Sequence, residues 1–160
     1  MTLRIRPVRS AVEVEAARDL FMAYAESLDF DLCFQGFDAE MARFPGEYVP
    51  PEGDLLLAMR EDQPVGVVAV RRFADGVAEM KRLYLTDAAR GLGAGRRLAE
   101  QVVERARALG YRSLRLDTAS SMVAAIHLYQ AMGFRRLPPP EPTGDGAGAS
   151  PELIYFELGL

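Results

Sequence analysis

The sequence predicts an α/β fold of the mixed α+β kind, with a central twisted mixed β-sheet of about six to seven strands flanked by about four helices. Three strand-like runs follow one another through short turns between residues 55 and 85, which is typical of antiparallel hairpins. Helix-like and strand-like runs then alternate as far as residue 156, which is typical of strand–helix–strand units. With 160 residues, 49% of them hydrophobic, the chain is expected to form a single domain over residues 1–160.

The first part of the chain is expected to supply one strand and two helices. Leu3 and Ile5, before a proline, predict a short first strand. Apolar residues recur at helical spacing from residue 11 to about residue 27, which predicts an amphipathic helix. A shorter helix is expected from about Asp38, and a proline-containing irregular segment follows it up to residue 53.

The middle of the chain is expected to form consecutive antiparallel strands. The runs 55–59 and 65–70 are joined near Asp62-Gln63-Pro64, and this pattern predicts a hairpin. Asp75-Gly76 then predicts a second turn before a strand over residues 77–85.

The rest of the chain alternates helices with strands. The expected elements are a helix from about 93 to 109, a strand at 114–118, a helix from about 120 to 132, and strands at 134–137 and 153–156. Gly110 and Gly133 are expected to end the two helices, and Ser120 or Ser121 is expected to cap the second. Residues 138–151 are rich in Pro and Gly and predict a loop.

A loop of small residues, Arg-Gly-Leu-Gly-Ala-Gly at positions 90–95, joins a strand-like run to a helix-like run. Unpaired backbone N–H groups and the helix dipole make such a junction an anion site. The loop lacks the Gly-Lys-Ser/Thr ending of a P-loop, and Arg96 stands where a dinucleotide fingerprint has its third glycine. Arg90, Arg96 and Arg97 surround the loop, and no acidic residue follows until Glu100. The pattern therefore predicts that the loop binds a pyrophosphate.

The run from Glu79 to Phe134 resembles the acetyl-CoA-binding core of the GNAT superfamily of N-acetyltransferases. The resemblance rests on three blocks, Glu79–Leu85, Arg90–Gly95 and Ala125–Phe134. It implies a GNAT-like sheet and a direct, acetyl-CoA-dependent transfer of an acetyl group to a primary amine of a small molecule or peptide. It implies no metal.

The resemblance also implies which residues bind acetyl-CoA. Backbone amides within residues 91–96 would hold the pyrophosphate. Main-chain groups of residues 83–85 would pair with the pantetheine arm like an added strand, and one N–H there would polarise the thioester carbonyl. The implied cofactor-binding residues are Leu83, Tyr84, Leu85, Arg90, Gly91, Leu92, Gly93, Ala94, Gly95 and Arg96.

Two catalytic residues are implied in the same way. Tyr129 matches the tyrosine that protonates the departing thiolate, and Glu79 matches a glutamate that acts as a base, often through water. Other interpretations stay open from the residues alone. Glu79 also fits an ion pair with Lys81 on the same strand face, and Tyr129 also fits a core aromatic.

One position departs from the family pattern. Many relatives carry an asparagine four residues before the isoleucine of the last block, and here that residue is Met122. Any hydrogen bond from that side chain to the cofactor is lost, and Ser120 or Ser121 would have to replace it.

The acceptor is expected to meet the first helix, residues 28–53 and the loop at 138–151. Carboxylates and aromatic rings gather there, which suits a cationic amine, although a solvated acidic surface fits as well. They are Glu26, Asp29, Phe30, Asp31, Phe34, Phe37 and Tyr48.

Composition excludes other classes of protein. A net charge of −4 without a dense basic stripe argues against nucleic-acid binding, and no apolar run is long enough to span a membrane. The single cysteine, Cys33, permits no internal disulfide, so a cytoplasmic location is expected. An exposed final strand would allow two copies to pair as a homodimer. The alternative function is a non-catalytic domain that binds or senses acyl-CoA.

Overall fold

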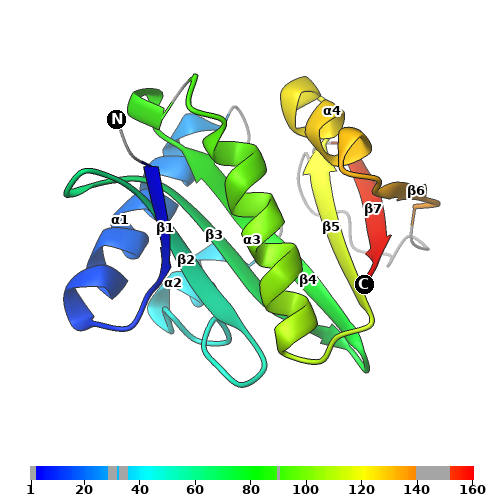
Figure 1. Ribbon diagram of the computed structural model, residues 1–160, viewed down its shortest axis with the longest axis horizontal. Coiled ribbons are helices and arrows are strands. Elements are labelled where there is room, and N and C mark those ends of the chain that lie inside the picture. The colour runs from blue at the N-terminus through cyan, green and yellow to red at the C-terminus, as the bar shows by residue number, and fades with distance from the viewer. Residues whose placement is uncertain (1–2, 29–31, 33–35, 90, 140–151) are drawn as a thin grey trace.

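A seven-stranded mixed sheet forms the centre of the computed structural model, which describes residues 3–28, 32, 36–89, 91–139 and 152–160 (Figure 1). The strands run in the order β1-β2-β3-β4-β5-β7-β6. They are β1 (Leu3–Pro7), β2 (Asp54–Arg60), β3 (Gln63–Ala74), β4 (Val77–Leu85), β5 (Ser113–Ala119), β6 (Arg135–Leu137) and β7 (Leu153–Gly159). The described helices are α1 (Ala11–Ser27), α2 (Phe37–Ala42), α3 (Ala94–Ala108) and α4 (Val123–Ala131). The predicted fold class is confirmed.

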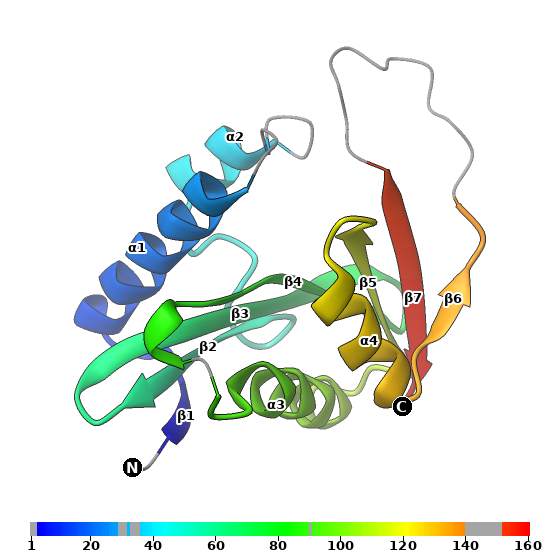
Figure 2. The same ribbon diagram turned by 90° about the horizontal axis from the view of Figure 1, so that it is seen from above.

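Helices cover both faces of the sheet. Figure 2 shows α1 and α2 on one face and α3 and α4 on the other. Each face has its own buried core, one containing Phe21 of α1 and the other containing Leu98 of α3. Leu114 and Leu116 of β5 belong to the α3 core, so the alternation of side chains along a strand turns Asp117 to the α1 face.

α1 begins at a capping box and places Tyr24 over the sheet. The Ser10 side chain accepts a hydrogen bond from the Glu13 N–H at 3.2 Å, and Glu13 Oε1 accepts one from the Ser10 N–H at 3.0 Å. The helix buries Phe21 against the sheet. Tyr24 lies one turn further on the same side, with its ring centroid 5.7 Å from that of Tyr84.

β4 and β5 are parallel and pair only at their beginnings. The three register pairs join residues 77–79 to residues 113–115. Beyond Glu79 the two strands diverge, so the edge of β4 over residues 80–85 faces β5 without a strand partner among the described residues. An unpaired edge inside a sheet offers main-chain donors and acceptors to a ligand.

A β-bulge interrupts β4 next to this edge. Val67 pairs with Tyr84 and Ala69 with Lys81, so one residue of β3 opposes two residues of β4. Arg82 adopts a φ of 60° there, which is uncommon for a residue with a side chain. The buried guanidinium of Arg82 binds both carboxylate oxygens of Glu40 in α2, at 3.3 and 2.9 Å. This contact ties α2 to the point where β4 changes direction.

Asp54, at the start of β2, holds together elements from both faces of the sheet. Its fully buried carboxylate accepts hydrogen bonds from Arg9 at 2.7 and 2.9 Å and from Arg105 of α3 at 2.6 Å. Burial alone raises the pKa of Asp54, but hydrogen bonds from Arg9, the Leu55 N–H and Arg105 outweigh it and bring the pKa below its usual value.

Two expectations about the C-terminal part are wrong. α4 begins after Met122 with no side-chain cap, so neither Ser120 nor Ser121 caps it. β7 lies between β5 and β6 and is not an edge strand, because the chain returns from β6 to the inside of the sheet. The predicted route to a homodimer through the final strand therefore loses its basis. Within the described residues, no helix is long and apolar enough to cross a membrane.

Candidate active site

The divergence of β4 and β5 opens a groove of about 700 Å³, which we call the β4–α4 groove. One wall consists of Leu83, Tyr84 and Leu85 on the open edge of β4, and the opposite wall consists of residues 121–125 and Leu128 at the start of α4. Gly95 of α3 and the C-terminal end of α1 complete the lining. The groove therefore brings together the β4 and α3 residues that the sequence predicted for cofactor binding.

The N-terminus of α3 presents free amides next to this groove. The N-cap is Gly93, with a φ of 66°, and no side chain caps the helix. The Arg97 N–H bonds to Gly93 O at 3.1 Å, whereas no acceptor within the described residues reaches the N–H groups of residues 94–96. These amides and the helix dipole favour an anion. Leu92 is half-buried and Gly91 exposed on the approach to the helix, and Arg90 lies outside the described residues.

Gly95 keeps the end of the groove open. A Cβ at this position would lie 3.3 Å from Leu85 Cδ1 and 3.9 Å from Leu128 Cδ2. A side chain would thus extend into the space between β4 and α4. The third glycine of the loop is therefore explained by close approach rather than by a positive φ.

Two of the three arginines predicted around the loop have partners in the protein, and the third, Arg90, lies outside the described residues. Arg96 binds Glu100 at 3.1 Å on the exposed surface of α3. Arg97 donates a hydrogen bond to Leu3 O at 2.9 Å, which commits it to β1. Of these two, only Arg96 stays close to solvent beside the loop, and an anion would have to share it with Glu100.

Tyr129 lies in α4, and its side chain is buried. Its ring packs against Phe134 and Phe156 at centroid distances of 5.6 and 6.1 Å. Burial, with smaller contributions from Tyr24 and Asp117, raises the pKa of Tyr129 well above its usual value. The hydroxyl therefore stays protonated and able to donate. Tyr129 also lines a cavity of about 70 Å³ that we call the junction cavity.

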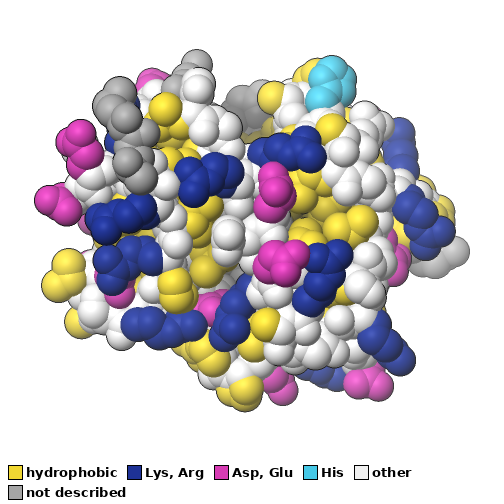
Figure 3. Space-filling model, viewed as in Figure 1, with side chains coloured by type: hydrophobic (Ala, Val, Ile, Leu, Met, Phe, Trp, Pro, Cys, Tyr) yellow, Lys and Arg dark blue, Asp and Glu magenta, His cyan; other side chains and the backbone are white. Residues whose placement is uncertain are grey.

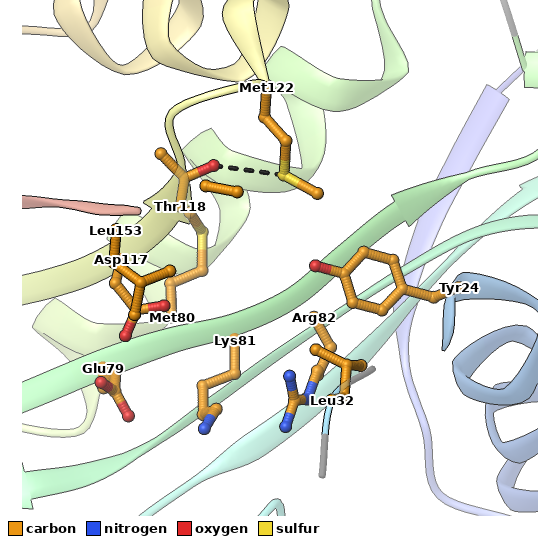
Figure 4. Close-up of a pocket in the computed structure, with 11 residues that line it drawn as sticks. Tyr24, Leu32, Glu79, Met80, Lys81, Arg82, Asp117, Thr118, Met122 and Leu153 are labelled. Atoms are coloured by element: carbon orange, nitrogen blue, oxygen red, sulfur yellow. Dashed lines mark hydrogen bonds between the residues drawn. The ribbon is translucent and has the colours of Figure 1, made fainter. Parts of the chain in front are cut away.

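Met122 occupies the position where many relatives keep an asparagine. Its sulfur accepts a hydrogen bond from the Thr118 hydroxyl at 3.3 Å (Figure 4). The side chain lines both the β4–α4 groove and the junction cavity. Of the two serines expected to compensate, Ser121 lines the groove.

On the α1 face, β4, β5 and the end of α1 enclose a polar space of about 40 Å³, which we call the charged cavity (Figure 4). Glu79, Lys81 and Arg82 line it from β4, and Asp117 lines it from β5. The Tyr24 hydroxyl points into it from α1 (Figure 4). Glu79 thus shares a cavity with Tyr24 of the first helix and with Leu32, which belong to the segments expected to meet the acceptor.

Glu79 is paired, although not with the residue that the sequence suggested. Its Oε1 accepts from Arg71 Nε at 3.1 Å and lies 3.0 Å from Arg71 Nη2. Arg71 also binds Glu47 at 2.8 Å, and it faces Glu79 directly across β3 and β4. An ion pair between Glu79 and Lys81 is absent from the described residues.

Lys81 is half-buried and lines three spaces at once. It contributes to the charged cavity, to the junction cavity and to a third cavity of about 110 Å³ beside Arg43 and Glu47, which we call the side cavity. Burial, together with repulsion from Arg82, lowers the pKa of Lys81 below its usual value despite the nearby Glu79.

Sequence reasoning missed two residues of this site, Tyr24 and Asp117. Tyr24 fits the apolar stripe of an amphipathic helix, and nothing in that pattern distinguishes a ring that lines a cavity from one in the core. Burial raises the pKa of Tyr24, with Arg82 opposing the shift and Asp117 adding to it. Asp117 alternates along its strand with Leu116 and Thr118, which are buried. This alternation could have predicted that the Asp117 side chain lies on the opposite face of the sheet.

The residues expected near the acceptor are not gathered in one place. Tyr48 is buried but lines the side cavity, whereas Phe37 is buried in the α1 core and Glu26 is exposed. Asp29, Phe30, Asp31 and Phe34 lie outside the described residues, as does Cys33. His127, the only histidine of the chain, is exposed on α4, and Figure 3 shows the histidine colour at the rim of the α3 and α4 face. On that face, positive and negative side chains are interspersed between apolar areas (Figure 3).

Comparison with known proteins agrees with this geometry. A model of the acetyltransferase (GNAT) family matches residues 14–134, which extend from α1 to the residue before β6. The chain belongs to this family. It is thus an N-acetyltransferase, as its resemblance predicted. The match includes the β4 edge, the glycine loop and Tyr129.

Two curated relatives and one solved structure illustrate the relationship. An uncharacterised N-acetyltransferase of Schizosaccharomyces pombe is 34% identical over 139 residues, which cover 86% of this chain and 85% of the relative. The N-acetylaspartate synthetase of Danio rerio is 32% identical over 74% of this chain, which spans only 44% of that protein. A GNAT-family acetyltransferase from Elizabethkingia anophelis with acetyl-CoA bound has the same fold, with a TM-score of 0.70 at 20% identity over 99% of this chain and 98% of that chain.

Proposed function

We propose that this acetyltransferase uses acetyl-CoA and transfers its acetyl group directly to a primary amine, without an acyl-enzyme intermediate. The observation that carries the proposal is the unpaired edge of β4 over residues 83–85. It runs along a groove that has the amides at the start of α3 at one end and that shares Tyr24, Leu83, Met122 and Ala125 with the junction cavity, which Tyr129 lines. The acetyl-CoA bound in a GNAT structure of the same fold supports this choice of donor.

The residues present suit coenzyme A. The amides of residues 94–96 would hold its pyrophosphate, with Gly91, Leu92 and Gly93 shaping the approach. The main chain of Leu83 and Leu85 would bind the pantetheine arm like an added strand. Bound there, the thioester supplies an activated acetyl group.

The chain's own groups fit the remaining steps. A lysine-like amine with a pKa of about 10.4 costs roughly 4.6 kcal/mol to deprotonate at pH 7. Glu79 would take that proton, directly or through a water in the charged cavity, while Arg71 holds the carboxylate in place. A β4 N–H would stabilise the oxyanion as the C–N bond forms. Tyr129 would donate its proton to the sulfur as the C–S bond breaks. The nitrogen would release its second proton to solvent as the amide forms, and Tyr129 would regain a proton from solvent.

Release of the free thiol from acetyl-CoA across a panel of primary amines tests the proposal. We expect amine-dependent thiol release, with initial-rate patterns that require both substrates to bind before product leaves. Ping-pong kinetics would contradict direct transfer. Binding of acetyl-CoA in a titration, without turnover on any amine or peptide of the panel, would instead favour a non-catalytic acyl-CoA-binding domain.

A further inference from the structure

We infer that Lys81 binds a carboxylate of the acceptor, so that the amine substrate is a small amino-acid-like zwitterion. The inference rests on the proposed function, because it assumes that the charged cavity receives the acceptor. It adds the chemical class of that acceptor and a residue that selects it.

The first argument is that Lys81 differs from the cations around it. Arg71 is bound by Glu47 and Glu79, and Arg82 is bound by Glu40. Throughout the described part of the chain, no carboxylate forms an ion pair with the Lys81 ammonium and no acceptor hydrogen-bonds it. Among the described residues, Lys81 is therefore a cation that lines the site without an ion pair or hydrogen bond of its own.

The second argument is energetic. A half-buried ammonium loses part of its hydration, and the attraction of Glu79 and Glu40 does not make up for this loss at Lys81. The lowered pKa of Lys81 reflects this loss, with burial as its largest cause. A ligand carboxylate beside the ammonium would supply the missing interaction, which makes binding of an anion here more favourable than on open surface.

The third argument is position. Lys81 lies beside Glu79, the proposed base, and it lines the charged, side and junction cavities together (Figure 4). These spaces of about 40, 110 and 70 Å³ suit a small acceptor. Arg43 lines the side cavity and likewise lacks an ion pair among the described residues, whereas Glu40 and Glu47 in the same lining are paired with Arg82 and Arg71.

The fourth argument is the balance of charge around the acceptor. Glu79 and Asp117 line the same cavity as Lys81. Carboxylates attract an incoming ammonium, and the lysine attracts a carboxylate attached to it. A simple alkylamine would leave Lys81 without a counterion, and a polyamine would place a second cation close to Lys81 and Arg82. An amino-acid-like zwitterion satisfies both signs.

The test compares matched acceptors on the purified full-length chain. Kinetics of thiol release are measured for a set of amino acids, for their carboxamides and for the amines left after decarboxylation. We expect the wild-type protein to favour the free carboxylate by roughly 10- to 100-fold in kcat/KM, as is usual for a hydrogen bond to a charged group. Lys81→Met should remove that preference, mainly through KM, and Lys81→Arg should retain most of it.

Arg107→Met is the matched control, because Arg107 pairs with Glu104 on the exposed surface of α3. It should leave the preference unchanged. Equal rates on amino acids and their amides in the wild-type protein would overturn the inference. An equal loss on all three acceptor types in Lys81→Met would also overturn it.

A binding measurement separates the two levels of the proposal. Amino acids are titrated into wild-type protein and Lys81→Met in the presence of CoA, and the dissociation constants are compared. If no acceptor supports thiol release but amino acids still bind and Lys81→Met weakens them at least tenfold, the proposed function fails and the carboxylate site stands. If amines are acetylated but Lys81→Met leaves amino-acid binding unchanged, the carboxylate site fails alone.

Discussion

The β4–α4 groove and the charged cavity meet at Tyr24 and Met122, yet they are built in opposite ways. The groove offers mainly main chain, through the open edge of β4 and the free amides at the start of α3. The charged cavity offers side chains that reach it from α1, β4 and β5, with Arg71 of β3 and Glu40 of α2 bound behind them.

The contrast indicates that binding of the donor depends less on individual side chains than binding of the acceptor does. Recognition by main chain tolerates many side chains, so one groove can serve a whole family with the same donor. Recognition by ion pairs depends on which side chains stand at a few positions. The acceptor can therefore change while the groove stays the same.

The largest effect that tests this contrast is expected at Tyr129, which lines the junction cavity and not the groove or the charged cavity. Tyr129→Phe keeps the ring contacts with Phe134 and Phe156 but removes the proton donor. We expect kcat to fall by roughly 10²- to 10⁴-fold while the dissociation constant of acetyl-CoA changes less than about threefold. Stopped assays measure kcat, and a titration with acetyl-CoA measures the dissociation constant. Tyr155→Phe on β7 is the control. Parallel losses of rate and affinity would make Tyr129 a packing residue.

Asp54→Asn tests the frame that both regions share. The variant removes the charge that Arg9 and Arg105 bind, so we expect a loss on the order of 3 kcal/mol in the free energy of unfolding at pH 7. Because the pKa of Asp54 is lowered in the folded state, its contribution is present above about pH 4 and is lost as the pH falls through the folded pKa.

Urea unfolding at several pH values measures this effect. The difference between wild type and Asp54→Asn should shrink as the pH falls below about 4. Glu104→Gln, which breaks an exposed pair with Arg107, should cost less than about 1 kcal/mol. A constant difference across the acid range would show that the Asp54 carboxylate does not carry the effect.

Glu79→Gln acts on the charged cavity alone. The amide still accepts a hydrogen bond from Arg71, so the fold is preserved while the proton acceptor is lost. We expect kcat/KM for the amine to fall about 100-fold at pH 7, with little change in the KM for acetyl-CoA. The deficit should shrink as the pH rises toward the amine pKa of about 10.4, since the free amine then needs no base. A loss of kcat/KM that does not depend on pH would show that Glu79 has a structural role and does not act as the base.

Gly95→Ala acts on the groove alone and should have the smallest effect. The added methyl group enters the space between Leu85 and Leu128. We expect the KM for acetyl-CoA to rise roughly tenfold, with the acceptor KM unchanged within about twofold. Gly159→Ala is the matched control, because no atom lies within 4 Å of its added Cβ. A rise in the acceptor KM alone would reverse the assignment of the two regions.

Sequence patterns predicted most of the fold because its signals are local. The turn at Asp75-Gly76, the helical periodicity of α3 and the alternation in β5 each depend on neighbouring residues. The error at β7 concerned a long-range choice. Strand order depends on which edge the chain returns to, and the alternation along β7 is the same at an edge or inside the sheet.

The groove was predictable for the same reason, and the charged cavity was not. The glycine loop and β4 lie close together in the sequence. The contact between Arg71 and Glu79 instead depends on the register in which β3 pairs with β4. Ala74 pairs with Val77, and a regular ladder would then place Glu79 opposite Arg72. The bulge near Phe73 shifts the register by one residue and presents Arg71 instead.

Tyr24 and Met122 line the β4–α4 groove, the junction cavity and the charged cavity. Because the same two side chains contact both the groove and the cavities, the binding of the donor and the binding of the amine depend on each other. If Tyr24 moves when one ligand binds, the space available to the other ligand changes. Thermodynamic linkage requires this dependence to be mutual. The factor by which the donor changes the affinity for the amine must equal the factor by which the amine changes the affinity for the donor.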